Sequence, residues 1–317
     1  MWQVLIGEEV PTGLLVSGEI VYVALENGQV HAMSAATGAL IWQISLNTRA
    51  TSAPAAGGGL ILIGGQDGTL RALSASDGRQ RWSFTTQAPL YAAPAVMADT
   101  VYCPSSDGTL YALALSDGAL RWKFLTGGPL HAQPTISKGV LYFGSGDARL
   151  YALEAATGAP RWRDGVLTQG PVECQPTIAG DRVLFGSGDG RMYALSVASG
   201  DEHWQYSTPD AVYAQPVVVG DTVYAASSGQ TLTALDVSSG RARWELRTVT
   251  ALNDPPAVAG DRLYFVAAGD PNLYAVDRAT GQVLWRMDTG DWLASGPVTV
   301  NGMVYLAGKD GTVSALR

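Results

Sequence analysis

The sequence predicts an all-β fold, an eight-bladed β-propeller of four-stranded blades, and three observations predict it. Eight of the nine tryptophans recur at intervals of 40 to 42 residues. Each period contains four short runs of β-forming residues separated by turn signals. The pattern stops in mid-unit at the C-terminus and resumes in mid-unit at the N-terminus. A period of about 40 residues with four strands per unit is typical of propeller blades.

The repeat keeps three residues in register. Its tryptophans are Trp2, Trp42, Trp82, Trp122, Trp162, Trp204, Trp244 and Trp285. An alanine stands ten residues before each of the last seven, and a glycine stands four residues before each. We expect the rings to be buried, and the glycines to form turns in which a positive φ costs them little. In residues 151–162, YALEAATGAPRW, this predicts the third strand, a turn and the outer strand of the fourth blade.

The last unit lacks its tryptophan. Ala315 is the eighth alanine of the series, and Trp2 supplies the missing ring from the other end of the chain. We therefore expect residues 1–8 to form the outer strand of the last blade and to close the ring. This arrangement makes residues 1–317 a single propeller domain.

Prolines support the assignment of the first strand. We expect one in the first strand of seven blades, with Leu14 at the same position of the eighth. A proline lacks the N–H that a ladder needs, and an innermost edge strand tolerates this. These prolines are Pro54, Pro94, Pro134, Pro176, Pro216, Pro256 and Pro297.

Composition excludes two classes of partner. The formal net charge is −8 and no run of Lys or Arg occurs, so we expect no nucleic-acid partner. No stretch approaches about 18 consecutive apolar residues, so we expect no direct membrane insertion. The first residues lack the basic and apolar regions of a secretion signal. The chain is then either cytoplasmic or, as we favour, a domain excised from a longer protein.

The two cysteines indicate no disulfide. Cys103 occupies a column of buried apolar residues in the repeat, and Cys174 occupies a column of small residues. One blade separates the two blades that carry them. Neither residue therefore indicates a redox compartment.

Candidate site residues are those that depart from the repeat. The most variable column lies three residues before the prolines, where we expect the mouth of a central funnel. It reads Pro11, Thr51, Tyr91, His131, Glu173, Tyr213, Asn253 and Ala294. We predict a ligand-binding rim there, formed by Tyr91, His131, Glu173, Tyr213 and Asn253 together with Asp254. The alternative is a solvated rim without a ligand.

Two further features belong to this predicted site. Gln133, Gln175 and Gln215 precede the proline in three successive blades and are expected to line the wall below the rim. Trp292 lies outside the tryptophan series, in the loop that leads into the last blade. It is either an anchor of that loop or a stacking surface for a flat ligand or a partner.

The repeated Ala, Gly and Trp resemble the tryptophan-docking repeat of the pyrroloquinoline-quinone (PQQ)-like propeller family. The resemblance covers the whole chain. WD40 repeats fit less well, because Asp follows none of the eight tryptophans. The family includes PQQ- and calcium-binding dehydrogenases, the lipoprotein of the outer-membrane β-barrel assembly machine, and extracytoplasmic sensor domains of bacterial Ser/Thr kinases.

The resemblance leaves three functions open. We favour a non-catalytic recognition domain of the sensor type, extracytoplasmic, without a cofactor, which binds a small molecule, peptide or protein at the funnel mouth. The first alternative is a scaffold of outer-membrane protein assembly. The second is a PQQ- and calcium-dependent dehydrogenase, for which Glu173, Asn253 and Asp254 would be the metal ligands and Trp292 the stacking ring. The chain lacks the adjacent-cysteine pair of many such enzymes.

Overall fold

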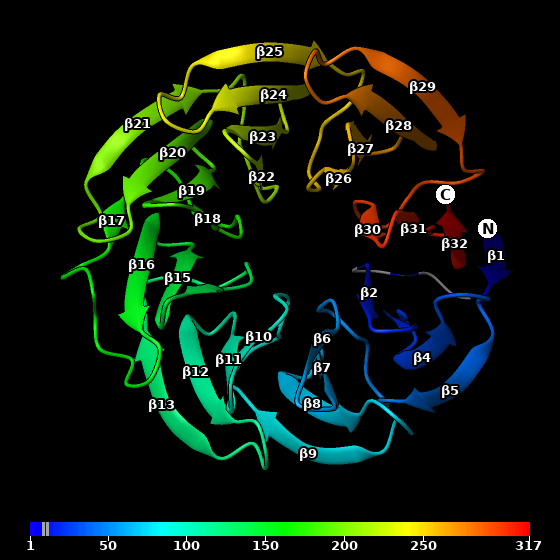
Figure 1. Ribbon diagram of the computed structural model, residues 1–317. Helices are drawn as coiled ribbons and strands as arrows, with labels where there is room; N and C mark the ends of the chain where they lie inside the picture. Colours follow the sequence, from blue (N-terminus) through cyan, green and yellow to red (C-terminus); the bar gives the residue numbers. More distant parts are fainter. Residues whose placement is uncertain (8–9, 11–12) are drawn as a thin grey trace. The chain divides into compact units, whose positions relative to one another are not determined.

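The computed structural model describes residues 1–7, 10 and 13–317. These residues form 32 strands, arranged as eight four-stranded antiparallel sheets, with no helix among them (Figure 1). Each sheet contains strands consecutive in the chain, except the sheet that includes the N-terminal strand. This is the predicted eight-bladed β-propeller.

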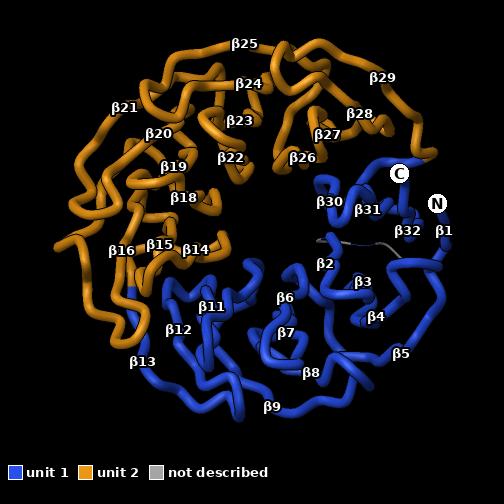
Figure 2. Tube along the Cα trace, in the orientation of Figure 1, with its two compact units in different colours: residues 1–125, 291–317 blue, residues 126–290 orange. Residues whose placement is uncertain are grey.

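The chain divides into two compact units, each with four blades (Figure 2). Unit 1 comprises Met1–Leu125 and Asp291–Arg317, and unit 2 comprises Thr126–Gly290. Within each unit, first strands of neighbouring blades contact each other, as β6 (Ala55–Gly57) does with β10 (Ala95–Met97).

Unit 1 contains the blades built from residues at both ends of the chain. Its first blade is β2 (Leu14–Ser17), β3 (Ile20–Ala24), β4 (Gln29–Ser34) and β5 (Leu40–Ser45). The second is β6, β7 (Leu60–Gly64), β8 (Thr69–Ser74) and β9 (Gln80–Thr85). The third is β10, β11 (Thr100–Pro104), β12 (Thr109–Ala114) and β13 (Leu120–Leu125). Its fourth blade is β30 (Val298–Val300), β31 (Met303–Ala307), β32 (Thr312–Leu316) and β1 (Trp2–Leu5).

Unit 2 contains four blades that follow one another along the chain. The first two are β14 (Thr135–Ser137), β15 (Val140–Ser145), β16 (Arg149–Glu154) and β17 (Val166–Leu167), and β18 (Thr177–Ala179), β19 (Arg182–Ser187), β20 (Arg191–Ser196) and β21 (Glu202–Ser207). The last two are β22 (Val217–Val219), β23 (Thr222–Ser227), β24 (Thr231–Asp236) and β25 (Ala242–Arg247), and β26 (Ala257–Ala259), β27 (Arg262–Val266), β28 (Asn272–Asp277) and β29 (Val283–Asp288).

The N-terminal strand completes the last blade, as predicted. β1 pairs antiparallel with β32, and Trp2 lies opposite Ala315. All other regular blades place the repeat tryptophan opposite the repeat alanine in the same way, for example Ala72 opposite Trp82. The strand ends at Leu5. Residue 8 of the predicted segment lies outside the described residues, as does Pro11 of the rim column.

The prolines lie immediately before the first strands of their blades. Each first strand that follows one begins at the next residue, as β14 does at Thr135 after Pro134. The prediction that they lie within these strands is therefore wrong. A proline has no N–H to donate to the ladder, and at the position before the strand none is required. Leu14, in contrast, is the first residue of β2.

A repeated contact, which we call the Trp–Gly clasp, joins neighbouring blades within each unit. The indole N–H of a repeat tryptophan donates to a carbonyl of the next blade, and the ring covers the glycine three residues further on. In unit 2, Trp204 donates to Val237 over 2.9 Å, and a Cβ added at Gly240 would lie 2.6 Å from the ring. Four other clasps are complete: Trp2 with Ala35 and Gly38, Trp42 with Ala75 and Gly78, Trp82 with Leu115 and Gly118, and Trp244 with Arg278 and Gly281.

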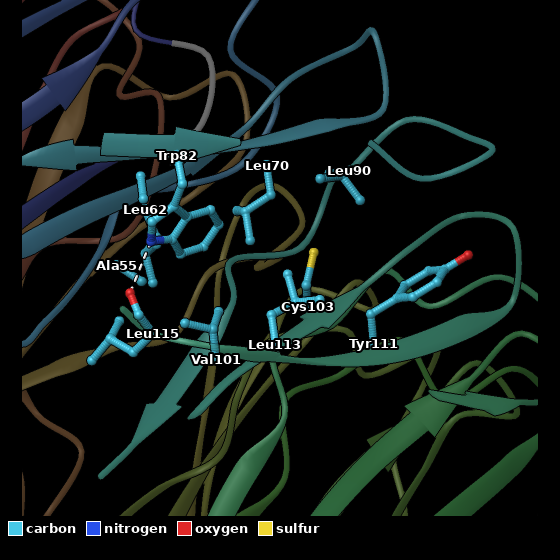
Figure 3. Packing of buried hydrophobic residues seen from close by; sticks show 11 residues of the cluster. Ala55, Leu62, Leu70, Trp82, Leu90, Val101, Cys103, Tyr111, Leu113 and Leu115 are labelled. Atoms are coloured by element: carbon cyan, nitrogen blue, oxygen red, sulfur yellow. Dashed lines mark hydrogen bonds between the residues drawn. The ribbon is translucent and has the colours of Figure 1, made fainter. Parts of the chain in front are cut away.

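The clasps are part of the cores between blades. Figure 3 shows the core that contains Trp82, whose indole N–H donates to the carbonyl of Leu115 over 2.8 Å. Leu62, Val101 and Leu113 belong to the same buried cluster. Burial of these side chains stabilises the contact between blades, by roughly 25 cal/mol per Å² of apolar area. We therefore expect the functional residues to lie outside this repeated set.

Two tryptophans depart from this pattern. Trp162 is buried and its ring lies over Gly200, but its indole N–H has no hydrogen-bond partner among the described residues. Trp285 is 36% exposed, although we expected it to be buried, and the other repeat tryptophans are less exposed.

The fourth blade along the chain also differs from the prediction for residues 151–162. Trp162 lies outside the last strand, which is displaced to β17. Pro160 forms only an isolated bridge with Leu153, and bends at residues 161–164 are followed by Gly165 at φ 68°. Pro160 cannot donate to the ladder, and the interval to the next tryptophan is two residues longer, which accommodates the bend.

Candidate functional site

The predicted rim residues of unit 2 lie in the loops that lead into its four first strands. His131 and Glu173 are half-buried, Tyr213 is 39% exposed, and Asn253 is exposed beside the half-buried Asp254. Because the four loops occupy the same position in successive blades, these side chains form a series along the unit. We call His131, Glu173, Tyr213, Asn253 and Asp254 the unit 2 rim.

The local sequence explains why these side chains point away from the core. Each of the three later loops begins with a fully buried apolar residue, Val172, Val212 or Leu252, immediately before the rim residue. The N–H of each apolar residue donates to a buried serine carbonyl, for example Val212 to Ser187 over 3.1 Å. The apolar anchor and the hydrogen bond fix the loop, so that the next side chain is directed outward.

Two neighbouring rim residues form a hydrogen-bonded pair that the sequence did not reveal. Nδ1 of His131 lies 3.0 Å from Oε1 of Glu173, and the two side chains are 34% and 31% exposed. The hydrogen bond from His131 lowers the pKa of Glu173, although partial burial acts in the opposite direction. The pair joins the first two blades of unit 2 at the rim.

We expect the pKa of Glu173 to rise when His131 is replaced by alanine. Because the folded-state pKa is lowered, the ionised carboxylate stabilises the fold above the ordinary glutamate pKa. That contribution is lost as the pH falls through the lowered pKa. A carbon-13 NMR titration of the Glu173 carboxyl in the wild type and in His131→Ala measures the shift. An unchanged pKa would show that the pair is absent in solution.

The rest of the unit 2 rim has its own contacts. Oδ1 of Asn253 accepts a hydrogen bond of 2.8 Å from the hydroxyl of Ser228, in the hairpin of the preceding blade. Ser228 and the pairing of His131 with Glu173 were missed by the sequence reasoning, which compared columns within the repeat and not across loops.

The glutamines form contacts between blades. Nε2 of Gln215 donates to the hydroxyl of Thr177 over 3.2 Å, and that hydroxyl donates to the carbonyl of Pro216 over 2.6 Å. Gln175, Thr135 and Pro176 repeat the arrangement one blade earlier, with a longer glutamine contact of 3.5 Å. The two threonines were missed by the sequence reasoning. The repeated Gln-Pro-Thr of residues 133–135 and 175–177 is the signal that could have identified them.

Gln175 and Gln215 each lie in the loop before one blade and contact a threonine in the first strand of the preceding blade, so they connect neighbouring first strands. Gln133 is half-buried at the corresponding place of the first blade of unit 2. A ligand-binding role of the three remains a prediction.

Two predicted site residues belong to unit 1. Tyr91 is 48% exposed in the loop before β10, and Trp292 is 51% exposed in the loop before β30. The carbonyl of Trp292 accepts a hydrogen bond of 2.8 Å from the N–H of Lys309, which fixes the loop and leaves the indole exposed. Thr51, at the rim position of the second blade, is buried, and its hydroxyl donates to the carbonyl of Leu90.

The two cysteines are free and buried, in agreement with the expectation of no disulfide. The N–H of Gly186 contacts the thiol of Cys174 over 3.3 Å. At the equivalent position of another blade, the N–H of Gly64 donates to the hydroxyl of Ser52. Burial raises the pKa of Cys174 to about 12, and that of Cys103 is also raised.

We expect neither cysteine to react with a thiol reagent in the folded protein at about pH 8, because reaction requires an accessible thiolate. Both should react once the protein is unfolded in denaturant. A colorimetric thiol titration with and without denaturant measures this, and a reaction in the folded protein would contradict the burial of that cysteine.

The predicted metal ligands do not fit a calcium ion and its quinone. Glu173 uses one carboxylate oxygen to pair with His131, and Asn253 uses its side-chain oxygen to accept from Ser228. Among the described residues, no three His, Cys, Asp or Glu side chains gather as a metal-binding group.

The eight four-stranded blades with their repeated tryptophans define a class of protein, the PQQ-like β-propeller. A family model described as outer membrane protein assembly factor BamB matches residues 1–129, 116–253 and 247–317. These matches span the whole chain, which therefore belongs to this BamB-like family of PQQ-type propellers.

Solved structures show the same fold at low sequence identity. BamB from Moraxella catarrhalis is 21% identical with a TM-score of 0.86, covering 99% of this chain and 96% of that one. The computationally designed protein Ika8 is 18% identical with a TM-score of 0.85, covering 98% and 96%. Quinohemoprotein alcohol dehydrogenase from Comamonas testosteroni is 16% identical with a TM-score of 0.82, covering 99% and 75%.

No curated protein matches the chain. In the described residues, no helix has the length and hydropathy needed to cross a bilayer.

Proposed function

We propose that this chain is a non-catalytic recognition propeller that binds a protein or peptide through its rim. The observation that carries the proposal is the unit 2 rim, a series of outward polar and aromatic side chains on loops fixed by buried anchors. A protein partner suits such a surface, because exposed tyrosines on rigid supports contribute much of the energy of many protein interfaces. Tyr91 and Trp292, which lie in unit 1, are proposed as binding residues of that unit.

We propose an extracytoplasmic sensor as the biological setting, with residues 1–317 as its single ligand-binding domain. The short loops between blades support it, since they leave the rim side chains uncovered by insertions. The hydrogen-bonded pair of His131 and Glu173 adds a fixed polar contact point, to which a partner can bind without first ordering the side chains.

A scaffold of outer-membrane protein assembly is the second candidate, because the family model that spans the chain carries the description of such a factor. The same rim would then bind another component of an assembly complex. The two candidates differ in the partner, and the experiment below distinguishes them.

Site-specific photo-crosslinking in the native host tests the proposal. A photoreactive amino acid at Tyr213 should yield a discrete crosslinked partner. The same residue at Leu167, which is 63% exposed on β17, serves as the control and should not. An assembly-complex component would support the scaffold, and an extracellular peptide or protein would support the sensor. Equal crosslinking at the two positions would overturn a rim site.

A further inference from the structure

A groove lies between the last two blades of unit 2, which are neighbours in Figure 1. It is formed at the strand ends opposite the rim loops, by β25 and by the turns that follow β22, β26 and β28. Its volume is about 350 Å³, which is in the range of sites for small molecules. The charged side chains that line it are Asp221, Arg243, Asp261, Asp277 and Arg278. We call it the Arg278 groove.

Arg278 departs from the repeat. It supplies the clasp carbonyl for Trp244, whereas the other complete clasps take this carbonyl from an apolar residue, such as Leu115 or Val237. The same carbonyl accepts a hydrogen bond of 3.1 Å from the Tyr224 hydroxyl. These two bonds fix the backbone of Arg278 and do not involve its guanidinium.

The guanidinium of Arg278 is poorly paired. Its Nη2 lies 3.6 Å from Oδ1 of Asp261, which is longer than a hydrogen bond. Its Nε is buried and has no hydrogen-bond partner among the described residues. Burial raises the pKa of Tyr224 and the guanidinium opposes this, so the phenol is a further neighbour. The side chain is 32% exposed, and the outer edge of its planar fork can bind a carboxylate through two parallel bonds.

Arg243, the other cation of the groove, is already paired. Its Nη2 lies 2.7 Å from a carboxylate oxygen of Asp221 and 2.7 Å from one of Asp236. Its Nη1 donates to the second oxygen of Asp221 over 3.1 Å. A ligand carboxylate is therefore expected at Arg278 and not at Arg243.

Two carboxylates near Arg278 can accept hydrogen bonds from a ligand. The side chain of Asp261 is 94% exposed, and its contact with Arg278 is the long one. Oδ1 of Asp277 accepts from the hydroxyl and the N–H of Thr280, which hold the pKa of Asp277 below its ordinary value. Oδ2 of Asp277 accepts no hydrogen bond within the described part of the chain. The groove thus presents a cation and two anions that are open to a ligand.

We propose that the Arg278 groove binds a free α-amino acid with an apolar side chain. The ligand carboxylate accepts from Arg278, and the ligand ammonium donates to Asp277 and Asp261. A simple anion is disfavoured, because the three aspartates and two arginines of the lining leave one net negative charge. Trp244 lines the groove and is half-buried, so its ring offers an apolar contact to the ligand side chain. This site is separate from the rim loops and does not depend on the proposed function.

Titration with L-leucine tests the proposal. The indole N–H of Trp244 and the Nε–H of Arg278, observed in nitrogen-15 NMR spectra, should shift saturably. We expect a dissociation constant on the order of a millimolar. L-Leucinamide lacks the carboxylate and 4-methylpentanoate lacks the ammonium, so each should bind at least about tenfold more weakly.

Two variants and a matched control locate the site. Arg278→Gln keeps the backbone carbonyl of the clasp and should weaken leucine binding at least about tenfold, as measured at the Trp244 signal. Asp261→Asn alters an exposed side chain and should also weaken binding. Arg247→Gln removes the same charge from an 83% exposed side chain on β25 and should bind leucine like the wild type.

Three results would each overturn the proposal. The first is the absence of a shift at about 50 mM leucine, well above the expected dissociation constant. The second is unchanged leucine affinity in Arg278→Gln and Asp261→Asn. The third is equal affinity for either analogue, because the groove would then recognise a single charge. If Arg278→Gln does not fold, Asp261→Asn and the two analogues decide.

Discussion

Replacing Trp204 by alanine is expected to lower the free energy of unfolding by about 3–5 kcal/mol. The ring is 7% exposed and covers Gly240, and its N–H donates to Val237 of the next blade. Its removal leaves a cavity between two blades and a carbonyl without its donor. Chemical denaturation, followed by circular dichroism, measures the change from the midpoint and slope.

Trp292 provides the matched control for this experiment. Its indole is 51% exposed and contributes little buried area, so Trp292→Ala should change the free energy of unfolding by no more than about 0.5 kcal/mol. Equal destabilisation of the two alanine variants would contradict the conclusion that the repeat tryptophans stabilise the fold and that Trp292 does not.

The second large effect is expected at Gly240. This residue has φ 68°, and a Cβ would lie 2.6 Å from the ring of Trp204. Alanine therefore adds a steric clash to backbone strain, and we expect Gly240→Ala to cost about 2–4 kcal/mol. The same denaturation measurement gives the value.

Gly260 separates the two contributions. It has φ 60°, but nothing lies within 4 Å of an added Cβ, so Gly260→Ala should cost only the backbone strain of about 1 kcal/mol. The difference between the two variants measures the contact of Gly240 with the indole ring. Equal costs would show that the ring does not lie against the glycine.

The repeated features of the fold were the easiest to predict, because the sequence pattern of each strand and turn occurs eight times. The alternation of β-forming runs and turns predicted the four-stranded blades, and the position of Trp2 predicted the pairing of β1 with β32. The prolines precede the first strands of seven blades and do not lie within them, and the other errors concern single blades. Pro160 and the longer interval after Trp162 displace the last strand of the fourth blade, because one proline removes a donor that the regular ladder uses.

The candidate site was predicted as a column, but its contacts were not. The sequence placed His131 and Glu173 in equivalent loops, yet whether two such side chains meet depends on rotamers and on the spacing between blades. Gln175 and Gln215 were expected to line a wall, which stays a prediction, and their contacts with threonines of the preceding blade were not foreseen. Thr51 shares the column but is buried, because its hydroxyl bonds the carbonyl of Leu90.

The central claim is that repeated residues hold the fold whereas the residues that depart from the repeat bind the partner. The most direct test compares partner affinity and stability in one variant, His131→Ala with Glu173→Ala and Tyr213→Ala, using the partner captured by crosslinking at Tyr213. We predict that affinity falls at least about tenfold while the unfolding midpoint stays close to that of the wild type. Unchanged affinity in this folded variant would contradict the claim.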